Sequence, residues 1–260
     1  MVRTLLIRGM LVGLVAGLLV FGFGKLFGEP QVDRAITFET ALDEVKAKAH
    51  AAMGMPAEIP EPELVSREVQ ASIGLFTGVV VYCTAFGGLF ALVFAYADGR
   101  VGRLSPRAVS ALLAAGGLIA VYVVPNVKYP ANPPSVGAPE TIGYRSAIYF
   151  LMMLISIAAM VAAVIAGKRL APRYGAWSAA LIAAAAYIAV IIVAQLLLPA
   201  INEVPDEFPA VVLWKFRIAS LGMQFVMWAT IGLLFGALTE RAMAASPRFP
   251  AKSGMQTASR

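Results

Sequence analysis

Histidine, cysteine and catalytic groupings are scarce in this chain, and each shortage excludes a class of protein. With His50 as the one histidine, the chain cannot by itself form an HExxH zinc site or supply two imidazoles to a membrane haem. The one cysteine, Cys83, lies inside an apolar run, so an internal disulfide is excluded and a buried, inert thiol is favoured. The sequence contains no glycine-rich phosphate loop and no grouping of a nucleophile with a base. We therefore predict that the protein is neither an ATPase nor another enzyme.

Charge is also scarce. Charged residues make up 14% of the chain and hydrophobic residues 60%, whereas soluble domains have roughly 25% and 45–50%. This composition predicts an integral membrane protein. The net charge of +6 is compatible with nucleic-acid binding, but in a chain this apolar the distribution of charge carries more information than its sum. We expect lipid, and no nucleic acid, as a partner.

Six apolar runs approach the roughly 20 residues that a helix needs to cross a bilayer. They are approximately Leu5–Phe23, Ile73–Tyr96, Val109–Val124, Ala147–Ala166, Ala176–Leu198 and Ile218–Leu238. The first run resembles a secretory signal, but a signal has a shorter apolar region that ends at a small-residue cleavage site. We predict that this run is an uncleaved helix. The sequence thus predicts an all-α, polytopic helical bundle that forms a single transmembrane domain over residues 1–241.

The distribution of lysine and arginine predicts the orientation of this bundle. One alternate set of flanking segments, which includes both termini, holds 12 basic and 2 acidic residues, and the other set holds 9 basic and 13 acidic residues. Basic flanking segments stay in the cytoplasm. We therefore predict that both termini are cytoplasmic and that the six helices form three hairpins that point outward. The basic tail, residues 242–260, is expected to be a disordered cytoplasmic segment.

The first outer loop, residues 25–72, is the longest. Between residues 38 and 52, Phe38, Leu42 and Val45 recur on one face at helical spacing, with charges opposite. This pattern predicts a short amphipathic helix on the outer surface. His50 and Met53 at its end form a weak candidate site for a late first-row metal. Their alternative interpretation is plain helix surface.

Glycines recur every four residues within three of the spans. Small residues at this spacing let helices approach closely in lipid, where the hydrophobic effect does not drive association. They therefore predict packing seams at Gly9, Gly13 and Gly17, at Gly74 and Gly78, and at Gly232 and Gly236.

Two proline-rich outer loops, 125–134 and 202–209, are expected to form rigid, extended caps. The spans themselves have almost no ionisable groups, which disfavours a proton relay inside the bilayer. Oxygen donors that suit a divalent cation gather instead on and near the caps. The candidate ligands are Asn126, Asn132, Glu140, Asn202, Glu203 and Asp206.

The alternative is that these acids only solvate the loops and pair with nearby cations. We expect those cations, Lys128, Arg145, Lys215 and Arg217, to hold the geometry of the caps rather than touch a metal ion, because like charges repel. Trp214, at the same boundary, is expected to anchor the cap at the membrane interface.

Several blocks of the caps resemble one known family. Lys128–Pro134 (KYPANPP), Asn202–Pro205, Phe208–Ala210 and Leu213–Arg217 (LWKFR) are similar to the predicted cobalt transporter subunit family, CbtA. The resemblance extends from about Arg3 to Arg241. It implies a multi-pass protein of the bacterial inner (plasma) membrane that takes part in cobalt uptake for vitamin B12 synthesis. Co²⁺ would be the transported substrate, and no permanently bound cofactor is implied.

The resemblance also implies a partner, a small single-span subunit (CbtB-like) with a histidine cluster. Some relatives carry more histidine in the first outer loop, where this chain has only His50. We therefore expect the partner to capture the metal and this chain to conduct it, as a permease-like subunit that the metal enters through the oxygen-rich caps. The alternative is a non-transporting structural or assembly subunit of a membrane complex. The metal, the energy source and a homo-oligomeric state stay open.

Overall fold

The computed structural model describes residues 2–54, 65–102, 104–134 and 136–245. All regular secondary structure in these ranges is helical. Six helical segments are long and apolar enough to cross a membrane, which confirms the six predicted spans. They are Val2–Ala52, Arg67–Ala97, Pro106–Lys128, Pro139–Tyr174, Ala176–Leu197 and Ala210–Ala245. Most of the predicted tail, residues 246–260, lies outside the described residues.

Three of the segments are composite helices with a π-helical turn inside them. Helix α1 (Val2–Phe23) continues through Gly24–Gly28 into α2 (Glu29–Ala52), and the short α3 (Arg67–Val69) continues through Gln70–Gly74 into α4 (Leu75–Ala97). Helix α5 (Pro106–Gly117) continues through Leu118–Val123 into α6 (Val124–Lys128). The remaining helices are a 3₁₀ turn at Pro139–Thr141, α7 (Ile142–Tyr174), α8 (Ala176–Leu197) and α9 (Ala210–Ala245).

Two of the π-helical turns explain where the predicted helix ends were wrong. A proline within a helix has no N–H and collides with the carbonyl group four residues earlier, and a widened turn accommodates both defects. Pro30 and Pro125 each lie two residues after the last residue of such a turn. As a result, the helix expected at 38–52 begins at Glu29 and continues α1, and it does not lie separately on the surface. The chain also stays helical through Pro125 to Lys128, so the extended cap begins at Tyr129 rather than at Pro125.

Helices α1 and α4 form the tightest seam of the bundle. A β-carbon at Gly9 would overlap the carbonyl oxygen of Gly87, and one at Gly13 would overlap that of Cys83. The two backbones therefore touch, which only glycine permits on the α1 side. The predicted seam at Gly9, Gly13 and Gly17 is confirmed.

A second seam joins α5 to α9. A β-carbon at Gly232 would overlap the Ala114 side chain, and the Ser110 hydroxyl donates a buried hydrogen bond of 2.6 Å to the Gly232 carbonyl. The predicted seam at Gly232 and Gly236 is thus confirmed. Gly78 faces open space, and Gly74 meets only its own helix, so the prediction of a seam at Gly74 and Gly78 was wrong.

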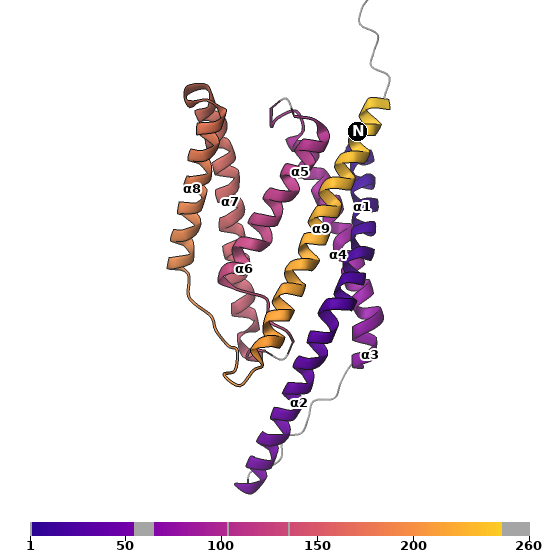
Figure 1. Cartoon of the computed structure of the whole chain (residues 1–260), viewed down its shortest axis with the longest axis vertical. Coiled ribbons are helices and arrows are strands. Elements are labelled where there is room, and N and C mark those ends of the chain that lie inside the picture. Colours follow the sequence, from indigo (N-terminus) through magenta and orange to yellow (C-terminus); the bar gives the residue numbers. More distant parts are fainter. Residues whose placement is uncertain (1, 55–64, 103, 135, 246–260) are drawn as a thin grey trace, which may run out of the picture.

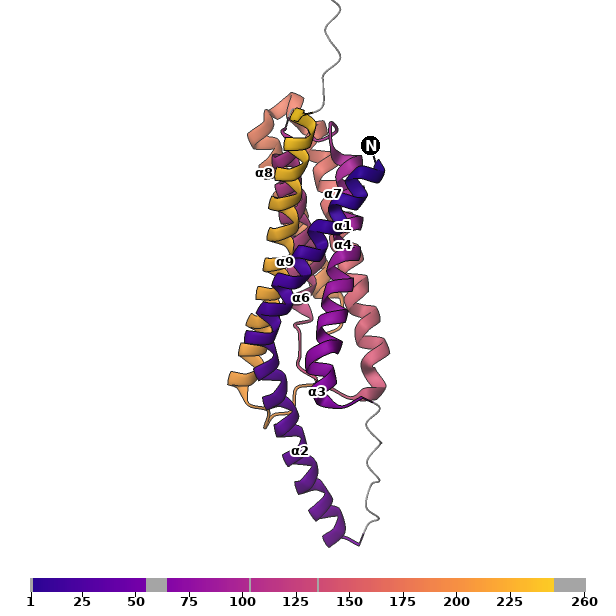
Figure 2. The same cartoon turned by 90° about the vertical axis from the view of Figure 1, so that its right-hand side faces the viewer.

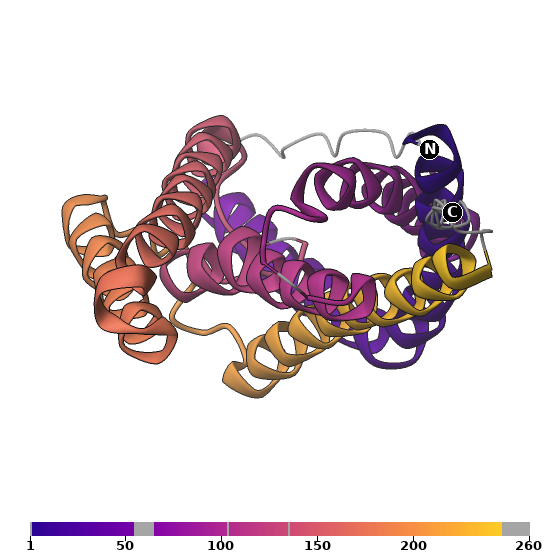
Figure 3. The ribbon, with the colours of Figure 1, turned by 90° about the horizontal axis from the view of Figure 1, so that it is seen from above.

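Helices α7 and α8 form a hairpin at the side of this four-helix core. Figures 1 and 3 show the pair standing apart from α1, α4 and α9. The two helices are joined by a buried hydrogen bond of 2.9 Å between Ser156 of α7 and Tyr187 of α8. The pair contacts α6 through the buried side chains of Met152 and Val124. Large apolar side chains elsewhere on the pair, such as Leu154 and Leu196, are exposed to the surroundings.

The two ends of the bundle differ in what they carry. The start of α1, the α4–α5 connection, the α7–α8 turn and the end of α9 lie together at one end, here called the terminal end (Figure 1). Side chains connect these segments: Arg8 donates to Thr239 at 3.1 Å, and Arg107 pairs with Glu240 at 2.9 Å. The α6–α7 and α8–α9 loops lie at the opposite end, the cap end, and α2 projects beyond them (Figures 1 and 2).

Candidate functional site at the cap end

Two loops lie at the cap end, residues 129–138 between α6 and α7 and residues 198–209 between α8 and α9. Glu203 joins them. Its Oε2 accepts hydrogen bonds from the Ala138 amide at 3.0 Å and the Thr141 hydroxyl at 2.8 Å, and it lies 3.3 Å from Nε of Arg145. We call this set the Glu203 clamp. The Thr141 hydrogen bond, with smaller contributions from the Ala138 amide and the Arg145 charge, lowers the pKa of Glu203 below its ordinary value.

Gly137 makes the clamp possible. Its φ of +108° lies in the left-handed region that other residues avoid. A β-carbon at this position would also overlap the Arg145 guanidinium and the Glu203 carboxylate. The backbone therefore passes close enough to the ion pair only because residue 137 has no side chain.

Helix α2 supports the clamp from one side. Phe38 packs edge-to-face on Phe208 of the α8–α9 loop, with ring centroids 5.2 Å apart. Ala35 and Val136 are buried in the same cluster. The first half of α2 thus belongs to the cap end. The apolar spacing of this helix was the only signal of the packing in the sequence.

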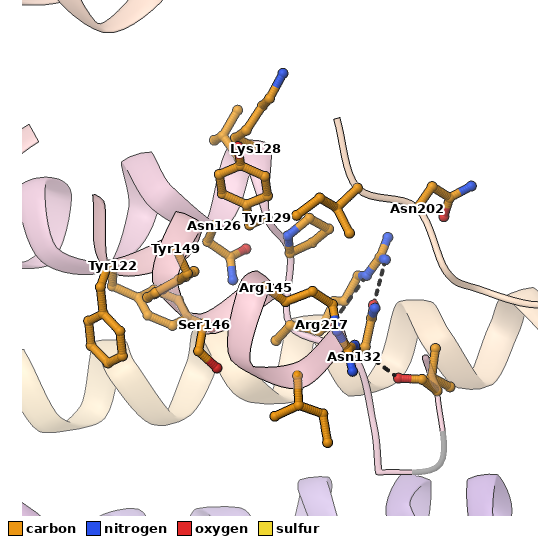
Figure 4. A pocket seen from close by; sticks show the side chains of 17 residues that line it. Tyr122, Asn126, Lys128, Tyr129, Asn132, Arg145, Ser146, Tyr149, Asn202 and Arg217 are labelled. Carbon is orange, nitrogen blue, oxygen red and sulfur yellow. Dashed lines mark hydrogen bonds between the residues drawn. The ribbon is translucent and has the colours of Figure 1, made fainter. Parts of the chain in front are cut away.

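A large cavity of about 760 Å³ opens beneath the caps, and Figure 4 shows the side chains around it. Its polar lining comes from α6, α7, α9 and both loops, and comprises chiefly Asn126, Lys128, Asn132, Arg145, Asn202 and Arg217. Tyr122, Tyr129 and Tyr149 form part of its wall. Among the described residues, the lining contains three cations and no carboxylate.

Hydrogen bonds hold two of these cations in place. Arg217 donates to the Ala131 carbonyl at 3.2 Å and to Oδ1 of Asn132 at 2.9 Å. Lys128 donates to the Gln195 carbonyl of α8 at 2.7 Å. These contacts agree with the predicted role of both residues in holding the geometry of the caps, which stays a prediction.

A smaller cavity of about 300 Å³ lies on the other side of the clamp, between α2 and the cap loops. Glu39, Asp43 and Glu203 line it, and Lys46, 3.7 Å from Asp43, is the one cation among the described lining residues. We call it the acidic cavity. Sequence reasoning missed Glu39 and Asp43, because their proximity to Glu203 depends on the packing of α2 against the α8–α9 loop.

The structure divides the predicted metal ligands among different places. Asn126, Asn132 and Asn202 line the large cavity, whereas Glu203 lines the acidic cavity. Glu140 and Asp206 are exposed on the caps. His50 and Met53 lie at the far end of α2, beyond the caps (Figure 1).

No donor set for a resident metal is found among the described residues, where no group of three or more His, Cys, Asp or Glu side chains is close enough to hold an ion. A third cavity, of about 200 Å³, lies within the helices, and its potential donors are the sulfur atoms of Cys83, Met223 and Met227, with Tyr82 and Gln224. Cys83 is 1% exposed, as expected for a packed thiol. Trp214, the predicted interfacial anchor, is 66% exposed at the start of α9.

The comparison with protein families identifies the chain. A family model described as "Probable cobalt transporter subunit (CbtA)" matches residues 2–240. The chain belongs to the CbtA family. CbtA membership and the six membrane helices together make it a multi-pass membrane protein and a subunit of a probable cobalt transporter. No curated protein and no solved structure matches the chain.

Proposed function

We propose that this chain is the permease-like subunit of a cobalt importer in the bacterial plasma membrane, with the cap end outside and both termini in the cytoplasm. The orientation follows from charge. Segments of the terminal end carry the basic residues Arg3, Arg100 and Lys168. The Nζ of Lys168 donates a hydrogen bond to the Arg100 carbonyl at 2.6 Å. Thirteen of the 15 acidic residues fall in the alternate segments, which include the caps and α2. Basic segments stay on the cytoplasmic side.

One observation carries the proposal that the cation enters at the cap end: carboxylates from α2 and from the α8–α9 loop line the same acidic cavity. Oxygen donors bind hard divalent cations, and a concave surface of one sign raises the local concentration of the opposite ion. Cobalt(II) prefers nitrogen donors to neutral oxygen donors. The acidic cavity therefore attracts the ion, while a small single-span partner supplies imidazoles for its capture.

Uptake of radiolabelled cobalt tests this function. Cells that express the chain together with a small single-span CbtB-like partner should accumulate cobalt above the background of the empty vector, and competition with nickel measures selectivity. Cells that express the chain alone should accumulate less. Cobalt accumulation at the empty-vector level with both proteins present and folded would contradict the proposal.

A second function has its own structural support. The α7–α8 hairpin exposes large apolar side chains along much of its length, including Leu154, Leu181 and Leu196. Such a surface fits a non-transporting assembly subunit that packs against other membrane proteins. Purification in mild detergent separates the two functions: a stable large complex without metal-dependent flux supports assembly, and flux from the chain and one small partner supports transport.

A further inference from the structure

The charge of the large cavity is opposite to that expected for a cation site. Lys128, Arg145 and Arg217 all line it, and none of its described lining residues is an aspartate or a glutamate. A bare divalent ion would be repelled from such a space. The three cations therefore require a different explanation from the transported metal.

Of these three cations, only Arg145 has a carboxylate partner among the described residues. Arg145 has its carboxylate partner in Glu203, whose side chain faces the acidic cavity. Lys128 donates to a neutral backbone carbonyl, and Arg217 donates to a carbonyl and an amide oxygen. Neither forms an ion pair with any carboxylate in the described ranges. Arg217 thus lies at the cavity as a half-buried positive charge without a carboxylate partner, and Lys128, whose ammonium is held by α8, adds a second such charge at the edge of the cavity. This arrangement is costly unless an anion supplies the counter-charge.

Neutral donors surround the same space. Asn126, Asn202 and Ser146 line the cavity, and no hydrogen bond between described residues uses these three side chains. Figure 4 shows the Asn126, Tyr149 and Arg217 side chains near one another, whereas the Lys128 side chain extends away from them. A guanidinium, an ammonium and amide N–H groups are the donors that proteins use to bind phosphate.

The geometry points to a phosphate-binding site in the large cavity, formed by Arg217 with Asn126 and Ser146, with Lys128 and Asn202 at its edge. The phosphate belongs either to the headgroup of an anionic phospholipid or to a free ion. The cavity volume of about 760 Å³ and the aromatic wall suit a headgroup with part of its glycerol backbone, since tyrosines of this kind gather at the level of lipid headgroups. This inference goes beyond cobalt uptake and does not depend on it.

Thermal unfolding of the purified full chain tests the site. Three series are recorded in detergent micelles: one with increasing phosphatidylglycerol, one with phosphatidylcholine and one with inorganic phosphate. If the phosphate belongs to a lipid, phosphatidylglycerol stabilises the chain more than phosphatidylcholine does, and inorganic phosphate has little effect. If the phosphate is a free ion, inorganic phosphate stabilises the chain without lipid. Equal effects of both lipids, with no effect of inorganic phosphate, overturn the inference.

Variants then locate the binding. Arg217→Gln should weaken the apparent affinity by about tenfold or more, as expected for the loss of a charge-assisted hydrogen bond. Arg217 also holds Asn132, so its loss can disturb folding as well as binding. A pair of variants at Ser146 avoids this problem. Ser146→Asp places a carboxylate in the cavity and should weaken binding, whereas Ser146→Asn adds no charge and should not. Lys215→Gln removes an exposed cation near the cavity that does not line it and serves as the charge control. Equal weakening by Lys215→Gln and Ser146→Asp would show general surface attraction and overturn the assignment.

Discussion

The Glu203 carboxylate and the Arg145 guanidinium face each other at 3.3 Å and join the two cap loops. The sequence suggested Glu203 as a metal ligand and Arg145 as a structural residue. In the structure, the two side chains form one clamp. Oε2 of Glu203 already accepts two hydrogen bonds besides this ion pair, so the position of the carboxylate is determined by the protein itself.

The clamp predicts coupling between its members. Glu203→Gln and Arg145→Gln should each lower the midpoint of thermal unfolding, because each removes a charge and leaves its partner unpaired. The double variant should be little less stable than either single variant, since both remove the same interaction. Unfolding midpoints of the four proteins measure the coupling. Additive losses would show that the two side chains act independently.

The lowered pKa of Glu203 predicts how this stabilisation depends on pH. A carboxyl whose pKa is lower in the folded state stabilises that state fully above its ordinary pKa, and the stabilisation disappears as the pH falls through the lowered value. Unfolding midpoints of the wild type and Glu203→Gln should therefore differ most near neutral pH. The difference should shrink below about pH 4. A difference that persists unchanged at pH 3 would refute a role for the ionised carboxylate.

The glycine seam between α1 and α4 predicts a large effect of a single methyl group. Gly9→Ala should destabilise the bundle by about 1–3 kcal/mol, because the backbone of α4 leaves no space for it. Gly78→Ala is the matched control, as its added methyl faces open space. It should be neutral or stabilise the helix by up to about 1 kcal/mol. Denaturation of both variants in detergent compares them, and similar losses would contradict the close approach.

The exposed face of the α7–α8 hairpin predicts where the proposed single-span partner packs. A cysteine at Leu154 of α7, 63% exposed, should cross-link to the partner in membranes. A cysteine at Leu11 of α1, 59% exposed on the core helices, is the control and should cross-link less. The native Cys83 is 1% exposed and contributes little background. Preferential cross-linking at Leu11 would place the partner elsewhere.

The six spans could be predicted from the sequence because their length and apolarity are local properties of the chain. The seam at Gly9, Gly13 and Gly17 could be predicted for the same reason, since spacing on one helix defines it. Gly74 and Gly78 have the same four-residue spacing, but no helix packs against Gly78. Glycine spacing therefore predicts a helix face that can be approached closely, but it does not predict whether another helix packs there. Gly87, which completes the α1–α4 seam, has Ala91 rather than a second glycine at four-residue spacing, so a pattern of glycines alone does not indicate it.

The candidate site was harder to predict because its residues meet only through tertiary packing. Asn126, Asn132 and Asn202 do line one cavity, as the cap hypothesis suggested. Its excess of positive charge arises because α6, α7 and α9 bring Lys128, Arg145 and Arg217 to the same cavity, while Glu203 lines the acidic cavity instead. The carboxylates Glu39 and Asp43 join Glu203 only because a π-helical turn lets α1 continue past Pro30 and bring α2 onto the caps.

Cobalt flux into liposomes tests the central claim most directly. The chain and its small partner are reconstituted together, and cobalt that enters is measured by quenching of a trapped dye. The wild type should give saturable flux, and the double variant Glu39→Gln/Asp43→Asn should need about tenfold more cobalt for the same rate. Glu44→Gln, on the same helix but outside the acidic cavity, should behave as the wild type. No cobalt flux from the folded wild-type pair, or equal flux from the double variant, would contradict the account.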